Sequence, residues 1–261
     1  MRYGHEVSST KRPVSTRVGV YIDAFNVYYG GRALCGRGTP GWRWLDIVSL
    51  ATDLINPAIW PNPEVTTVAY CTALRDREGD PSSLADQHTY IGALQHRYPA
   101  VSVVDGKYMA RMKAGALVDM AERPPRRVLS PGTTHLPAWL PVTEVPGPAG
   151  QAELLATIST FEEKGSDVNV ASHLLLDVLT DRVDAAMIFS NDSDLRVPLE
   201  LARQRLPVAT INPRAKPTAT DLRGDPNSGA GRHWWRRLKA NDFRKHQLSD
   251  QIGPHAKPAG W

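Results

Sequence analysis

The feature that most constrains this chain is the alternation of short apolar runs with segments of helical spacing. Runs rich in β-branched residues are typical of buried strands, and they lie at Val18 to Ile22, Val65 to Thr72, Val101 to Val104, Ala185 to Ser190 and Val208 to Ile211. Helical spacing marks the segments Ser83 to Tyr98, Val168 to Thr180 and Leu195 to Arg205. This alternation predicts an α/β fold with a central, mainly parallel sheet flanked by helices.

Two further segments bear on domain organisation. The stretch from Ala152 to Phe161 fits either period, because its large apolar residues suit a helix while "TIST" suits a strand, and we favour the strand. The stretch from Glu122 to Gly150 holds seven of the 21 prolines, so we expect an insertion there, near 122–150, and no domain boundary. We therefore expect a flexible leader over 1–17, one domain over 18–246 and a C-terminal tail over 247–261.

Composition narrows the cellular setting. A chain of 261 residues with 41% hydrophobic content can bury a large core without disulfides. Its two cysteines, Cys35 and Cys71, lack CxxC spacing, so neither a disulfide framework nor a thiolate zinc site is indicated. The sequence has neither a run of about 20 apolar residues nor an apolar secretion segment, so we expect a cytoplasmic protein without membrane spans.

The positive charge is concentrated near the C-terminus. The segment from Arg223 to His246 contains seven Lys and Arg residues and two Asp residues, a net charge of +5. The whole chain has a net charge of +4, so the remaining residues together carry about −1. Within this segment, "GRHWWRRLKANDFRKH" interleaves tryptophans with basic residues such as Arg236 and Arg237. Cations attract phosphates and aromatic faces stack on unpaired bases, so the segment suits RNA. It equally suits an amphipathic terminal helix with its tryptophans on the core.

Acidic residues recur at the ends of the expected elements. Asp23 ends the run "VGVYID", Asp167 precedes a helical segment, and Asp192 and Asp194 follow a strand. Singly, Asp167 is explained as an N-cap, and Asp192 or Asp194 as a cap of the next helix. Together, four carboxylates near the carboxyl ends of parallel strands favour a hard divalent cation, Mg²⁺ or Mn²⁺.

Three stretches carry a resemblance to a known family. "YIDAFNVYYG", "EKGSDVNVASHLLLD" and "MIFSNDSDLRVPLELAR" resemble the signature blocks of the NYN family, the DUF88 or LabA-like group related to PIN nucleases. The resemblance runs from Val18 to His246 and covers the Pro-rich insertion least. It implies a PIN-like three-layer α/β sandwich whose clustered acids bind metal and hydrolyse RNA. Many relatives have Gly where this chain has Asn191, which leaves the acids in place.

The resemblance also implies roles for individual residues. Asp23 and Asp192 would bind the metal directly, and Asp167 and Asp194 directly or through water. Asn26 would hydrogen-bond a water, a phosphate or an Asp, unless it is simply a turn residue after the strand. The metal would polarise the phosphodiester and generate a bound hydroxide. We therefore expect a Mg²⁺- or Mn²⁺-dependent nuclease, an endoribonuclease, with RNA as its partner and a homodimer left open.

Other basic residues are candidates for contacts with RNA. Lys164 precedes the acidic helix start, and "GKYMARMK" supplies Lys107, Arg111 and Lys113 after a strand. Their alternative is a set of solvated side chains on a loop and at an edge.

Two other function classes stay open. The first is an RNA-binding or regulatory module with little catalytic turnover, and the second is a metal-dependent phosphatase. The haloacid-dehalogenase form of a phosphatase is disfavoured because Ala24 and Phe25 follow Asp23. A dinucleotide-binding enzyme is disfavoured because GxGxxG follows none of the expected strands.

Overall fold

The computed structural model describes residues 15–74, 81–121, 123–130, 139–147 and 150–261. These residues form two compact units, which are described separately. The first comprises Met1–Lys107 and Gly165–Trp261, and the second comprises Tyr108–Lys164. The expected leader lies outside the described residues except for residues 15–17, and strand β1 already begins at Thr16.

The first unit is built on a six-stranded sheet in the order β11-β10-β9-β1-β2-β3. All its neighbouring strands are parallel. The strands are β1 (Thr16–Asp23), β2 (Pro63–Thr72), β3 (Val101–Asp105), β9 (Ala185–Phe189), β10 (Val208–Asn212) and β11 (Trp234–Arg237). The strands expected from apolar runs are therefore confirmed, and β11 adds one at the edge.

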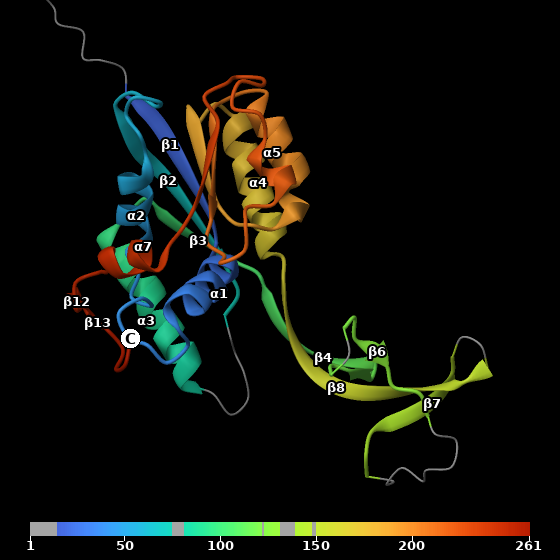
Figure 1. Ribbon diagram of the computed structural model, residues 1–261. Helices are drawn as coiled ribbons and strands as arrows, with labels where there is room; N and C mark the ends of the chain where they lie inside the picture. Colours follow the sequence, from blue (N-terminus) through green and yellow to red (C-terminus); the bar gives the residue numbers. More distant parts are fainter. Residues whose placement is uncertain (1–14, 75–80, 122, 131–138, 148–149) are drawn as a thin grey trace, which may run out of the picture. The chain divides into compact units, whose positions relative to one another are not determined.

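Helices cover both faces of this sheet (Figure 1). One face carries α1 (Ala24–Cys35), α2 (Ile47–Leu54), α3 (Pro81–Arg97) and α7 (Ala240–Lys245). The other carries α4 (Ser166–Leu179), α5 (Arg196–Arg203) and the short α6 (Thr220–Arg223). Residues of β1 alternate between the two cores, because Val20 and Ile22 pack in one and Tyr21 in the other. The mixed α/β architecture with a parallel sheet between helices is thus confirmed.

Three helices on one face differ from the sequence expectations. Neither α1 nor α2 was expected, and α1 begins at Ala24, directly after β1. The basic aromatic segment does not form one amphipathic helix, since it divides into β11 and α7. Trp234 is half-buried with its ring 5.6 Å from that of Trp60, whereas Trp235 is 40% exposed. The interpretation of tryptophans as core anchors therefore holds for the first tryptophan only.

The second unit consists of two small sheets, in which β7 pairs with β8 and β5 with β6 in antiparallel fashion. Its main sheet has the order β4-β8-β7, formed by β4 (Lys107–Ala116), β8 (Ala152–Lys164) and β7 (Val142–Pro146). A smaller pair joins β5 (Val118–Asp119) to β6 (Arg126–Arg127). The ambiguous stretch after Ala152 is therefore a strand, as favoured. The Pro-rich stretch contributes β6, β7 and the segments around them.

The C-terminal residues are part of the first unit. β12 (Gln251–Ile252) and β13 (His255–Ala256) form a hairpin on α3, where the ring of His255 lies 6.3 Å from that of His96. Among the described helices, none combines the length and apolar character that crossing a bilayer requires.

Candidate functional site

The candidate site lies where the order of the sheet reverses. From β1 the chain continues to β2 and β3 on one side, while β9, β10 and β11 extend the sheet on the other. In open parallel sheets, ligands bind at this switch point, outside the carboxyl ends of the strands. Asp23 ends β1 and Ser190 directly follows β9, so both lie at that edge. Because Ile22 pairs with Phe189, the two residues also stand at the same level.

Asp23 is held by the helix that follows it and by the neighbouring strand. Its side chain is buried, with 5% exposed. Oδ1 accepts a hydrogen bond from the N–H of Asn26 at 2.9 Å and so caps α1. Oδ2 accepts from Nδ2 of Asn26 at 2.9 Å and from Oγ of Ser190 at 3.1 Å. Asp23 therefore links the start of α1 to the end of β9.

Asn26 extends this network to a third strand. Its Oδ1 accepts from Nε of Arg214 at 2.8 Å and from the N–H of Asn191 at 3.3 Å. Arg214 follows β10, and its own N–H donates to Oδ1 of Asn212 at 2.8 Å. Asn26 lies inside α1, so the interpretation of it as a turn residue is wrong. The amide instead connects a carboxylate to a guanidinium across three strand ends.

The remaining acids stand around this network. The N–H of Asp192 donates to Oγ of Ser190 at 3.1 Å, and Oδ1 of Asp192 accepts from the N–H of Asp194 at 3.1 Å. Asp192 thereby caps a 3-10 turn, η2 (Ser193–Leu195). This agrees with the expectation that Asp192 or Asp194 caps the next helix. Asp194 is exposed.

Asp167 lies in the first turn of α4 and is half-buried. It is not the N-cap, which is Gly165 in a left-handed conformation with φ 95°. That capping interpretation is therefore wrong. A carboxylate in the first turn still interacts favourably with the helix dipole. α4 packs against β1, β2 and η2.

The network determines what kind of cation site this edge could form. Within residues 15–74, 81–121, 123–130, 139–147 and 150–261, no group of three or more His, Cys, Asp or Glu side chains is disposed to hold a metal ion. A cation here would therefore rest on one or two carboxylates. Ser190 links the carboxylate of Asp23 to the backbone N–H of Asp192, so these two acids are the nearest pair in the network.

The charge of Asp23 also reaches the adjacent strand β2. Burial, together with the nearby Asp23 carboxylate, raises the pKa of the Cys71 thiol to about 12. Burial likewise raises the pKa of Tyr70, with the same carboxylate as the second cause. Both groups therefore stay protonated at neutral pH, and neither adds negative charge beside Asp23.

The expected basic residues near β4 and β8 fall mostly in the second unit. Lys107 begins β4 in the first unit, while Arg111 and Lys113 lie further along that strand. Lys113 forms an ion pair with Glu162, and Nζ of Lys164 lies 3.4 Å from the other oxygen of that carboxylate. Glu162 partly offsets these two lysines, so the solvated-edge interpretation suits them better than that of a phosphate clamp.

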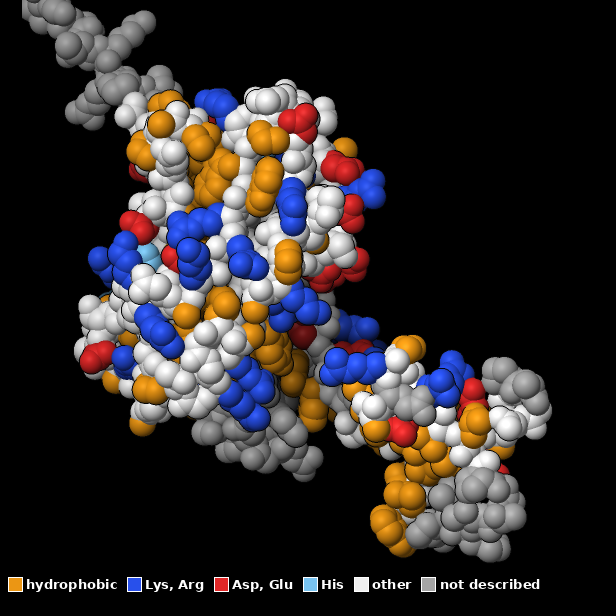
Figure 2. Space-filling view, in the orientation of Figure 1, with side chains coloured by type: hydrophobic (Ala, Val, Ile, Leu, Met, Phe, Trp, Pro, Cys, Tyr) orange, Lys and Arg blue, Asp and Glu red, His pale blue; other side chains and the backbone are white. Residues whose placement is uncertain are grey.

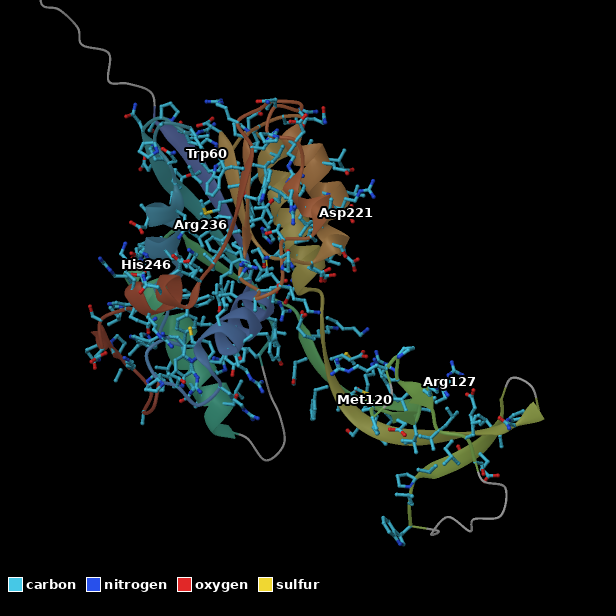
Figure 3. The ribbon with its side chains drawn as sticks, in the orientation of Figure 1. Trp60, Met120, Arg127, Asp221, Arg236 and His246 are labelled. Atoms are coloured by element: carbon cyan, nitrogen blue, oxygen red, sulfur yellow. The ribbon has the colours of Figure 1, made fainter. Side chains whose placement is uncertain are left out.

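The expected arginines of the C-terminal segment differ in their surroundings. Arg236 and His246 lie on the side of the first unit that carries α7 (Figure 3). Nη2 of Arg236 lies 2.7 Å from Oδ1 of Asp242, so its charge is paired. Arg237 pairs in register with Asn212 at the carboxyl end of β10, and its Nη1 donates to the carbonyl of Ala215 at 3.3 Å. Of these two arginines, Arg237 therefore lies near the loop that contains Arg214.

Sequence reasoning missed Arg214 and Ser190. The hydroxyl of Ser190 donates to the Asp23 carboxylate and accepts from the backbone N–H of Asp192. The sequence contained the same indication for Arg214 and Ser190, because each lies just after a buried strand, at the edge of the sheet where polar residues were expected. "NPR", which begins at the last residue of β10, matches "SND" after β9 in that respect.

Comparisons with known proteins add one relative and one structure. The family models match no part of the chain. The chain is 30% identical over 209 residues to 6-hydroxy-3-succinoylpyridine 3-monooxygenase HspA of Pseudomonas putida, covering 73% of this chain and 56% of that protein. The chain therefore spans about half the length of that relative. A crystal structure of a protein of unknown function from Vibrio parahaemolyticus aligns with a TM-score of 0.44 and 14% identity, covering 91% of this chain and 99% of that one.

The relative corrects one expectation. Its name describes an oxidation, which points away from hydrolysis of phosphodiesters and contradicts the prediction of a Mg²⁺- or Mn²⁺-dependent endoribonuclease. The resemblance to the NYN family stays a prediction.

Proposed function

We propose that the first unit is an RNA-binding module with a PIN-like fold, which holds RNA phosphates at the carboxyl edge of its sheet. The observation that carries this proposal is the hydrogen-bonded chain from Asp192 through Ser190, Asp23 and Asn26 to Arg214. Asp192 enters this chain through its backbone N–H, so the chain joins the Asp23 carboxylate to the Arg214 guanidinium at the switch point, where parallel sheets bind ligands. Carboxylates alone repel a polyanion, so the acids require a cation between them and the phosphate.

A divalent cation shared with the RNA suits these residues. Mg²⁺ usually keeps several waters and is bound by one or two carboxylates together with phosphate oxygens of the ligand. Asp23 and Asp192 would hold Mg²⁺ or Mn²⁺, which would supply positive charge to a phosphate. The half-buried Asp192 is the more open of the two. Asp167 and Asp194 would act through water.

Arginines at the same edge support direct contacts with phosphate. Arg214 is held in place by Asn26, and the exposed Arg237 lies beside the same loop. Guanidinium groups bind phosphate oxygens through paired N–H donors. On the face drawn in Figure 2, Lys and Arg side chains are interspersed with apolar ones over the first unit. Such a surface attracts a nucleic acid strand and contacts its bases as well.

The test is the affinity for single-stranded RNA in Mg²⁺ and in EDTA at equal ionic strength, followed by fluorescence anisotropy. We expect Mg²⁺ to tighten binding to the wild-type chain and Asp192→Asn to remove most of that gain. Asp250→Asn is the matched control, since Asp250 is exposed and pairs only loosely with Lys257 at 3.3 Å. An affinity that is equal in Mg²⁺ and in EDTA would overturn the role of the carboxylates.

The relative favours a second candidate, the hydroxylation of an aromatic heterocycle. The name places the oxidation at C3, the ring carbon that carries the succinoyl group. One atom of dioxygen would form the ring hydroxyl and the other water, while the ring–succinoyl C–C bond breaks and that group leaves as an aldehyde, with four electrons and four protons from a donor such as a reduced nicotinamide. Incubation with 6-hydroxy-3-succinoylpyridine, air and NADH tests it. Oxygen uptake that needs both the pyridine and the donor supports this candidate, and uptake indifferent to the pyridine overturns it.

A further inference from the structure

One face of α1 carries aromatic side chains that are partly exposed. Phe25, Tyr28, Tyr29 and Arg32 recur at helical spacing, so they share that face. Phe25 and Tyr28 are half-buried, and Tyr29 is 36% exposed. The rings of Phe25 and Tyr29 lie 6.2 Å apart, and those of Tyr28 and Tyr29 meet edge to face at 5.4 Å. Neighbouring aromatic rings left open to solvent mark a surface for a planar ligand.

This face lines a cavity of about 400 Å³, a size typical of ligand pockets. Trp42 forms another wall, with its ring 5.6 Å from that of Tyr28. Trp42 is held in the core and donates from Nε1 to the carbonyl of Gly36 at 3.2 Å. The wall is therefore fixed before any ligand binds.

The charge of the cavity favours an anion. Three arginines and one aspartate line it, namely Arg32, Arg37, Arg43 and Asp86. In the described part of the chain, none of these arginines forms an ion pair. The guanidinium of Arg32 lies 6.0 Å from the ring centre of Tyr29, and that of Arg43 lies 5.5 Å from Trp42. Cations therefore lie close to the aromatic rings that line the cavity, where they attract an anionic ligand.

Arg214 lies between the carboxyl edge and Tyr29, which lines the cavity. Its guanidinium lies 5.9 Å from the ring centre of Tyr29, while its Nε donates to Asn26. Asn26 and Tyr29 are three residues apart on α1, a rise of about 4.5 Å along the helix. A phosphate at Arg214 would therefore bring the attached nucleotide to the aromatic face.

We propose that this cavity binds an unpaired nucleobase of RNA, stacked on Tyr29 and Phe25, with its phosphate at Arg214 and Arg32. This inference rests on the proposed function and adds a preference for single-stranded RNA. Bases within a duplex are already stacked and paired, so they cannot enter the cavity.

The test compares a short oligoadenylate with a duplex of similar length, in Mg²⁺, for the wild-type chain and two variants. Tyr29→Leu removes the ring but keeps apolar bulk, and Tyr29→Phe keeps the ring. Because Tyr29 is partly exposed, both variants should fold, which a melting curve checks. We expect Tyr29→Leu to weaken binding of the oligoadenylate by about tenfold and to leave duplex binding and the effect of Mg²⁺ unchanged. Tyr29→Phe should bind nearly as the wild type does.

The remaining outcomes separate this inference from the proposed function. Oligoadenylate binding that Tyr29→Leu leaves unchanged overturns the inference alone. A wild-type chain that binds neither RNA overturns both. If a free aromatic acid such as 6-hydroxynicotinate binds and Tyr29→Leu abolishes only that binding, the cavity serves a small molecule and the assignment to RNA is wrong.

Discussion

Replacing Gly30 by Ala tests how the site is assembled. A Cβ at this position of α1 would lie 2.1 Å from the carbonyl oxygen of Pro213 and 2.6 Å from its carbon. Real contacts of this kind hardly ever fall below 3.0 Å, so the helix and the Pro213 backbone must separate by about 0.9 Å (3.0 − 2.1). Arg214 follows Pro213 directly. An equal displacement would stretch its 2.8 Å bond to Asn26 to as much as about 3.7 Å, beyond hydrogen-bonding range.

The magnitude follows from overpacking against the backbone. Such changes cost about 1–3 kcal/mol, and the better helix propensity of Ala offsets about 0.5–1 kcal/mol of that. A net loss of about 1–2 kcal/mol would lower the melting temperature of a unit of this size by about 2–8 °C. Urea unfolding measures the stability, and anisotropy with RNA measures the site.

The control is Gly38→Ala, because a Cβ there has nothing within 4 Å. We expect its stability to stay within about 0.5 kcal/mol of the wild type. If Gly30→Ala matches Gly38→Ala in both stability and RNA affinity, the close approach of α1 to Pro213 does not hold Arg214 in place, and the reasoning is refuted.

Three further changes probe other parts of the first unit. Burial lowers the pKa of His233, so the folded chain does not take up the proton that the unfolded chain binds near pH 6.5. The free energy of unfolding should therefore be highest above that pH and fall below it. His233→Gln should flatten this pH dependence, measured by urea unfolding at several pH values. Tyr21→Phe removes the buried 3.0 Å hydrogen bond from the hydroxyl to Oδ2 of Asp177, and it should lower the free energy of unfolding by about 1–3 kcal/mol in the same assay. An unchanged free energy of unfolding would mean that water replaces the hydroxyl. Arg237→Gln should lower the salt slope of RNA binding by about 1, and the ion-paired Arg236→Gln by less; equal slopes would contradict a contact at Arg237.

The sheet could be predicted from the sequence because its central strands are buried on both faces. Val18, Val20 and Ile22 are fully buried, and such runs stand out without knowledge of their partners. Polar residues directly after those runs indicated the edge, which is why Asp23 and Asn26 were found.

The missed elements depend on contacts between distant segments. Helix α1 contains Gly30 and Gly31, which weaken a helical pattern in sequence. The fold explains both, since a Cβ at Gly30 would meet Pro213 and one at Gly31 would lie 2.8 Å from the ring of Trp42. Arg214 is 188 residues from Asn26, so no local pattern relates them.

The basic aromatic segment was misread for the same kind of reason. Tryptophans and arginines at mixed spacing suit a helix surface, but the free edge of β10 pairs with Trp234 to Arg237 and makes them a strand. Tertiary pairing thus overrides the local pattern.

The most direct test of a cation shared between protein and RNA is the number of Mn²⁺ ions bound, measured by electron paramagnetic resonance with and without single-stranded RNA. The shared site predicts that RNA adds one tightly bound Mn²⁺ to the wild-type chain beyond those bound by either component alone. Asp192→Asn should lose that ion, and Asp250→Asn should keep it. A Mn²⁺ count that RNA does not raise, or that Asp192→Asn leaves unchanged, would contradict the account.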